Sequence, residues 1–222
     1  MAQPSATTES IELDELLAKG SELLQKDQVQ AARDCFAEAL ELSPDSEKVL
    51  GLCGLTHFRL DDFAAAREVY DRLVKKNPSD ASYRLNLGLV HLKLNNPVAA
   101  IDELDRSREL DPSQIRTVSY LGLAYARNGE YAKAYDAFLR ADQSALASEM
   151  EQYLGEAERD AIRATIQEVP DEDGEPIVGS GDEEEKPEAP ESVAEAAPEP
   201  EPEPESEPES EPESEPESEP ES

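Results

Sequence analysis

The sequence predicts an all-α fold: a right-handed α-solenoid of four helical hairpins, closed by a further helix and followed by a disordered acidic tail. Three observations support this prediction. Residue types recur with a spacing of 34 along most of the chain. Within each period, apolar residues recur at helical intervals on both sides of a polar break. Beyond residue 169 aromatic residues are absent, and glutamate, proline and serine predominate.

Four series of residues share the 34-residue spacing. Small residues form two of them: Gly20, Gly54, Gly88 and Gly122, and Ala32, Ala66, Ala100 and Ala134. Large residues and prolines form the others: Phe36, Tyr70, Leu104 and Phe138, and Pro44, Pro78 and Pro112. Because independent residue types keep one spacing over several periods, the sequence predicts four repeats. Their expected bounds are 13–46, 47–80, 81–114 and 115–146.

The second repeat shows why each period is expected to hold two helices. Its first half places Val49 and Cys53 on one helical face. Asp61–Asp62 then interrupts the pattern, and a second apolar stripe begins at Phe63. Pro78 ends that stripe, because a residue that precedes proline is disfavoured in the helical conformation. The other repeats show the same succession of stripe, break, stripe and turn.

The glycine series requires a packing explanation, since a glycine in mid-helix costs about 1 kcal/mol relative to alanine. We expect the glycine and alanine series to let the two helices of a hairpin approach closely. The large residue four places after each alanine is expected to fill the gap towards the next repeat. Both expectations concern the interior of the solenoid.

Three segments flank the repeats. Residues 1–10 are expected to be a disordered N-terminus, and residues 147–169 form an amphipathic pattern typical of a capping helix. Residues 170–222 carry 23 acidic residues and one lysine. Such a segment buries too little apolar surface to fold, so it is predicted to be a disordered acidic low-complexity tail.

The period and its residue types resemble the tetratricopeptide repeat, over about residues 13 to 146. The departures are mild. Arg84 and Val118 stand where the family usually has an aromatic residue, and Leu146 stands where proline would be expected in the fourth repeat. The resemblance implies that the first helix of each repeat lines a concave surface that binds peptides.

That implied groove contains apolar side chains, five cations at its edges and one neutral amide, Asn86. The candidate residues are Lys48, Leu52, Leu55, Arg59, Leu85, Asn86, Leu89, Lys93, Arg116, Tyr120, Leu123 and Arg127. Apolar side chains supply affinity for a peptide, and cations supply orientation and association rate. The expected partner is therefore a protein segment with acidic and apolar residues.

No catalytic, cofactor-binding or metal-binding residues are predicted, because the sequence lacks a phosphate-binding loop, a zinc-protease motif and a nucleophile elbow. His57 and His91 share one repeat position, so a core role outweighs a metal or proton-relay pair. Cys35 and Cys53 are expected to be small core residues, with a regulatory disulfide as the alternative. The chain is therefore predicted not to be an enzyme.

The sequence thus predicts a cytoplasmic adaptor or scaffold, and a dedicated chaperone for a secretion or assembly substrate is the alternative. A net charge of −33 disfavours nucleic acid, and no apolar run predicts membrane insertion. The tail is interpreted as a spacer, a binding arm for a basic partner or an autoinhibitory segment. The sequence leaves the oligomeric state open.

Overall fold

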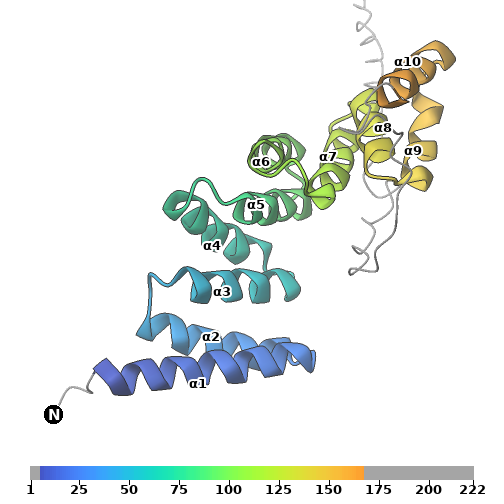
Figure 1. Cartoon of the computed structure of the whole chain (residues 1–222). Coiled ribbons are helices and arrows are strands. Elements are labelled where there is room, and N and C mark those ends of the chain that lie inside the picture. The colour runs from blue at the N-terminus through green and yellow to red at the C-terminus, as the bar shows by residue number, and fades with distance from the viewer. Residues whose placement is uncertain (1–5, 168–222) are drawn as a thin grey trace, which may run out of the picture.

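The computed structural model describes residues 6–167, and within that range the chain forms ten α-helices and no strand. The helices follow one another in chain order along the stack, and each of α1 to α9 packs mainly on its neighbours in sequence (Figure 1). Helix α10 instead packs on α8. The predicted all-α fold of successive hairpins is confirmed. The predicted tail lies outside the described residues.

Eight helices pair into four hairpins. These are α1 (Ala6–Gln25) with α2 (Val29–Leu42), α3 (Glu47–Arg59) with α4 (Phe63–Lys76), α5 (Ala81–Lys93) with α6 (Pro97–Leu110), and α7 (Ile115–Arg127) with α8 (Tyr131–Arg140). The closing segment comprises α9 (Ser144–Met150), a 3-10 turn (Glu151–Tyr153) and α10 (Glu156–Gln167).

The turn inside each hairpin is the same structure repeated every 34 residues. Its central residue has a left-handed backbone in all four: Asp27 (φ 59°), Asp61 (φ 58°), Asn95 (φ 55°) and Gly129 (φ 77°). Aspartate, asparagine and glycine are the residues that tolerate this conformation best. The next amide then closes the preceding helix, as when Asp62 N donates to the carbonyl oxygen of His57 at 3.0 Å. The polar breaks in the sequence are therefore helix-ending turns.

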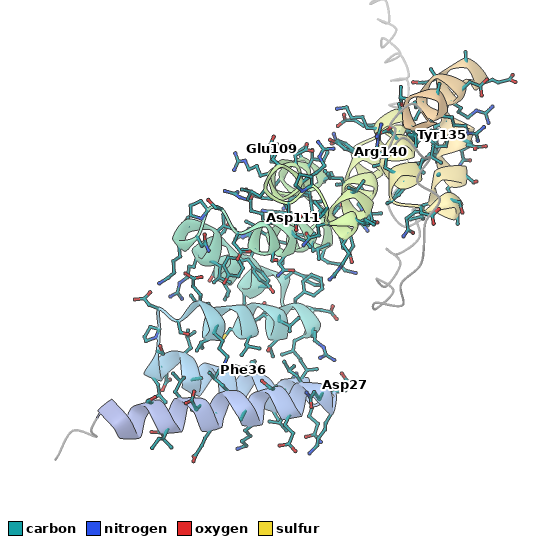
Figure 2. All side chains as sticks on the ribbon, in the orientation of Figure 1. Asp27, Phe36, Glu109, Asp111, Tyr135 and Arg140 are labelled. Atoms are coloured by element: carbon teal, nitrogen blue, oxygen red, sulfur yellow. The ribbon has the colours of Figure 1, made fainter. Side chains whose placement is uncertain are left out.

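The periodic glycines lie beneath the large residue of their own repeat. A Cβ on Gly20 would be 2.4 Å from Cε1 of Phe36, which lies on α2 where it faces α1 (Figure 2). The equivalent contacts pair Gly54 with Tyr70, Gly88 with Leu104 and Gly122 with Phe138. The expected close approach of paired helices therefore depends on glycine. The large residue closes its own hairpin, while also sharing a core cluster with the next repeat.

Helix α1 begins before the expected boundary of the first repeat. It starts at Ala6, although residues 1–10 were expected to be disordered. A helix nucleated by packed residues further along propagates at low cost, because each added residue gains a hydrogen bond. On its outer side α1 is charged: Lys19 is exposed where the later repeats bury Cys53, Leu87 and Leu121.

The closing segment differs from the single capping helix predicted over 147–169. Helix α8 ends at Arg140, and Asp142 (φ 55°) forms the same left-handed turn that is found inside the hairpins. Helix α9 therefore begins at Ser144, inside the range assigned to the fourth repeat. The chain breaks again at Leu154, whose backbone is extended, before α10.

Glu151 fixes α10 in place. Its carboxylate accepts hydrogen bonds from Tyr135 Oη at 3.3 Å, from Arg159 Nη1 at 3.2 Å and from Arg163 Nη2 at 2.6 Å. Tyr135 belongs to α8 and both arginines belong to α10, so one carboxylate joins the two helices. Stacking of Tyr131 on Tyr153, with ring centroids 3.9 Å apart, adds a second connection.

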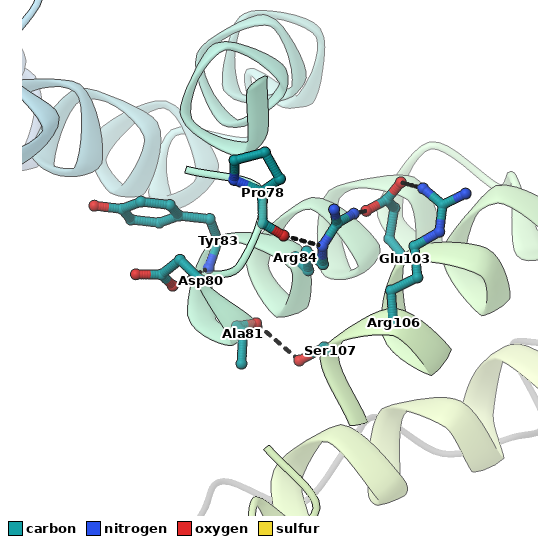
Figure 3. Close-up of polar contacts among 8 residues, drawn as sticks. All are labelled: Pro78, Asp80, Ala81, Tyr83, Arg84, Glu103, Arg106 and Ser107. Atoms are coloured by element: carbon teal, nitrogen blue, oxygen red, sulfur yellow. Dashed lines mark hydrogen bonds and ion pairs between the residues drawn. The ribbon is translucent and has the colours of Figure 1, made fainter. Parts of the chain in front are cut away.

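An ion pair replaces an apolar contact in the third repeat. Arg84 Nη1 lies 2.8 Å from Oε2 of Glu103, and the two side chains are only 11% and 16% exposed (Figure 3). Arg84 Nε also donates to the carbonyl oxygen of Pro78 at 2.9 Å. The departure from the repeat pattern at Arg84 is thus accommodated by a carboxylate on the facing helix and by the preceding turn.

Candidate peptide-binding groove

The predicted groove residues lie on α3, α5 and α7, the first helices of the second, third and fourth hairpins. Their exposure falls into three classes. Exposed side chains are Lys48, Leu55, Arg59, Lys93 and Arg116. Half-buried side chains are Leu52, Asn86, Leu89, Tyr120 and Arg127. The remaining two, Leu85 and Leu123, are buried.

Leu85 and Leu123 therefore belong to the interior rather than to an accessible trough. They are 4% and 5% exposed, and both belong to the core cluster of the C-terminal half. Each lies where successive helices of the stack meet, so neighbouring helices cover it. The apolar surface left accessible is narrower than the sequence suggests. It consists of Leu55, which is 41% exposed, and the half-buried Leu52, Leu89 and Tyr120.

Two of the five cations are tied to the preceding hairpin. Arg59 Nη2 lies 2.7 Å from Oδ1 of Asp27, and its Nη1 donates to the carbonyl oxygen of Leu24 at 3.3 Å. Arg127 Nη1 donates to the carbonyl oxygen of Leu92 at 2.7 Å. Both carbonyls lie in the last turn of a helix, where positive charge is favourable. These two arginines therefore stabilise the contact between successive hairpins and also add positive charge to the groove.

Two other cations lack an ion partner among the described residues. Lys48 on α3 and Arg116 on α7 are exposed and form no hydrogen bond or ion pair with the described residues. They occupy the same repeat position, 68 residues apart. Because neither charge is neutralised by a neighbour, both are available to a carboxylate from another molecule.

Gly51 on α3 belongs to the same surface, although it is not among the groove residues predicted from the sequence. A Cβ on Gly51 would meet no heavy atom of a neighbouring helix within 4 Å, unlike a Cβ on the periodic glycines. The signal in the sequence was a glycine three residues before Gly54, at a repeat position where Leu17 and Leu85 stand in the flanking repeats.

The two histidines are half-buried, and their surroundings differ. His57 Nδ1 lies 3.2 Å from Oδ2 of Asp62, the residue that caps α4. Burial lowers the pKa of His91, against the raising effect of the Asp71 and Glu103 carboxylates. Within residues 6–167 no group of three or more His, Cys, Asp or Glu side chains is arranged to hold a metal ion.

Cys35 and Cys53 are buried free thiols on α2 and α3. Cys53 Sγ donates to the carbonyl oxygen of Phe36 at 3.5 Å, and burial raises the pKa of this thiol to about 11. The structure therefore shows two reduced core residues at the contact between the first and second hairpins.

This environment predicts slow thiol chemistry. In a Cys35→Ser variant, Cys53 should react with DTNB about 100-fold more slowly in the folded chain than in urea, measured by absorbance near pH 8. The reason is that a thiol pKa about two units higher lowers the thiolate fraction by that factor. Equal rates in both states would show that the contact between α2 and α3 opens readily.

A pocket of about 360 Å³ lies away from the groove residues. It is lined by residues of α6, α7, α8 and α10, with Tyr125 and Ile162 among the apolar ones. Its cations are paired: Arg108 lies 2.8 Å from Asp105, Arg140 lies 2.8 Å from Asp136, and Lys133 pairs with Glu130. Because these charges are neutralised, this pocket offers less to a charged ligand than the groove does.

None of the helices in the described range combines the length and the apolar character needed to cross a bilayer.

Comparison with known proteins identifies the repeat. Two family models, both described as tetratricopeptide repeat, match residues 52–115 and residues 16–46. No curated protein matches the sequence.

Solved structures share the fold. MamA from Desulfovibrio magneticus RS-1 (residues 41 to the end) is 22% identical, with a TM-score of 0.56 over 64% of this chain and 76% of that chain. MamA AMB-1 is also 22% identical, with a TM-score of 0.53 over 59% and 72%. A mutant of the O-GlcNAc transferase of Thermobaculum terrenum is 25% identical, with a TM-score of 0.51 over 63% of this chain but 27% of that enzyme.

Proposed function

We propose that this chain, which is a tetratricopeptide-repeat protein, is an adaptor that holds a segment of a partner protein along α3, α5 and α7. Repeat solenoids of this kind present an extended concave surface and typically serve as scaffolds for protein–protein interaction. The proposal here is narrower, since it names the surface and the chemistry of the bound segment.

One observation carries the proposal: on the first helices, exposed cations that form no ion pair with the described residues lie near apolar side chains that are exposed or half-buried. Lys48 and Leu55 lie two turns apart on α3, and Arg116 and Tyr120 lie one turn apart on α7. The described fold carries a net negative charge, so the cations are concentrated on this surface and not spread evenly. It favours a peptide that brings carboxylates and apolar side chains together.

The test is affinity capture with mass spectrometry from the native cell, using the wild-type chain and a Lys48→Glu/Arg116→Glu variant. Both side chains are exposed and form no ion pair with the described residues, so the fold should persist, as circular dichroism will show. We expect at least one partner to be recovered about tenfold less with the variant, equivalent to about 1.4 kcal/mol of binding free energy.

The matched control is Lys19→Glu/Lys75→Glu, which makes the same change in net charge at two exposed lysines outside the groove. Lys19 lies on the outer side of α1, and Lys75 lies on α4, the second helix of its hairpin. Partner recovery should match wild type in this control. If both double variants recover the same partners as wild type, the groove does not bind them.

A further inference from the structure

Gly51 leaves an unfilled position on the first helix of the second hairpin. The equivalent positions in the flanking repeats hold Leu17 and Leu85, and both leucines are buried. At Gly51 there is no side chain, and an added Cβ would meet no heavy atom of a neighbouring helix within 4 Å. The second repeat therefore lacks a group that its neighbours bury at this point.

Helix packing does not explain this glycine. Gly54, three residues further along α3, is held by packing, since a Cβ there would lie 2.9 Å from Cζ of Tyr70. Gly51 has no such contact, and glycine is the least favourable helical residue after proline. A glycine is useful, however, where another molecule must come close to the backbone.

The surroundings of Gly51 specify what could approach it. Lys48 lies one turn before Gly51 and Leu55 one turn after it, so the three positions share a face of α3. The ammonium group of Lys48 forms no hydrogen bond or ion pair with the described residues, and the Leu55 side chain is 41% exposed. The face thus presents a cation, a gap and an apolar side chain in succession.

We infer that the gap over Gly51, between Lys48 and Leu55, receives a leucine-sized aliphatic side chain of a partner peptide, and that a nearby carboxylate of that peptide pairs with Lys48. This inference rests on the proposed function and adds a specificity-determining position to it. The size follows from the repeat itself, because leucine is the side chain that fills this position in the repeats on either side. The charge follows from Lys48, whose ion partner is missing among the described residues.

The test uses a phage-displayed library of random peptides of about 12 residues, selected on the immobilised full chain. Wild type should select peptides that carry leucine, isoleucine or methionine within about four residues of aspartate or glutamate. The variant is Gly51→Leu, which fills the gap with the chain's own side chain. The control is Ala64→Leu, which adds the same side chain at an exposed position on α4.

The strongest selected peptide is then synthesised and its affinity measured by fluorescence anisotropy. We expect Gly51→Leu to weaken binding by about tenfold or more, while its thermal midpoint rises by about 3 °C because leucine favours the helix. Ala64→Leu should bind as wild type does. If Gly51→Leu binds the peptide more weakly but melts at a higher temperature, the loss of binding comes from the filled gap and not from a damaged fold.

The outcomes distinguish this inference from the function on which it rests. If wild type selects no peptides that combine acidic and aliphatic residues, the proposed function is wrong. If such peptides are selected but bind Gly51→Leu within about twofold of wild type, the gap is not a binding position and the groove proposal remains. A lower thermal midpoint for Gly51→Leu would show that the gap is filled in the folded chain, which also overturns the inference.

Discussion

Replacing Gly88 with leucine should lower the free energy of unfolding by about 3 kcal/mol or more. A Cβ on Gly88 would lie 2.6 Å from Cγ of Leu104, and the helices α5 and α6 would have to separate to admit a whole side chain. Overpacking of this kind costs about 1 to 3 kcal/mol for smaller additions, which exceeds the helical preference of leucine over glycine. The measurement is urea unfolding followed by far-UV circular dichroism.

The matched comparison is the same substitution at Gly51, also inside a first helix, which has open space instead of a neighbour. There the free energy of unfolding should rise by about 0.5 to 1 kcal/mol, because only the helix preference changes. An unchanged midpoint for Gly88→Leu would mean that α5 and α6 are not in contact at this point.

The second large effect concerns the ion pair of Arg84 and Glu103. Arg84→Leu should lower the free energy of unfolding by about 2 to 3 kcal/mol. It leaves the largely buried Glu103 carboxylate with Arg106, 3.4 Å away, as its ion partner among the described residues. Removing one partner of a buried pair is strongly destabilising, while replacing both with apolar residues is often neutral. Urea unfolding gives the free energies.

The second repeat supplies the apolar version of this pair. Leu50 and Val69 stand at the positions of Arg84 and Glu103, and they pack in one apolar cluster. The double variant Arg84→Leu/Glu103→Val should therefore lie within about 1 kcal/mol of wild type. If the changes in free energy of unfolding caused by Arg84→Leu and by Glu103→Val sum to that of the double variant, the ion pair contributes nothing to the packing of α5 on α6.

Much of the fold was predictable because the signals were local and repeated. The periodic glycines predicted close helix pairs, and the polar breaks coincide with the left-handed turns at Asp27, Asp61 and Asn95. The broken cap was not predicted. Leu146 stands where proline marks the other repeat boundaries, and the turn at Asp142 follows Gly129 after only 13 residues, outside the repeat spacing.

The candidate groove was harder to predict for a different reason. Counting positions along a helix tells which side a residue faces, but it does not tell whether a neighbouring hairpin covers that side. Leu85 and Leu123 were therefore assigned to the surface although they are buried. Likewise, no local pattern reveals that Arg59 reaches Leu24, 35 residues earlier. The peptide-binding role of the remaining residues stays a prediction.

The charged outer side of α1 and the carboxylate of Glu151 give the array two unlike ends. In a stack of hairpins each unit is stabilised by its neighbours, so an end unit has half the support of an internal one. On α1, Lys19 is exposed to solvent. In the closing segment, Glu151 joins α8 to α10 through three hydrogen bonds. Thermal opening should therefore have a direction: it begins at the first hairpin and spreads towards the cap. The proposed binding surface on α3 would then lie next to the part of the described fold that opens first.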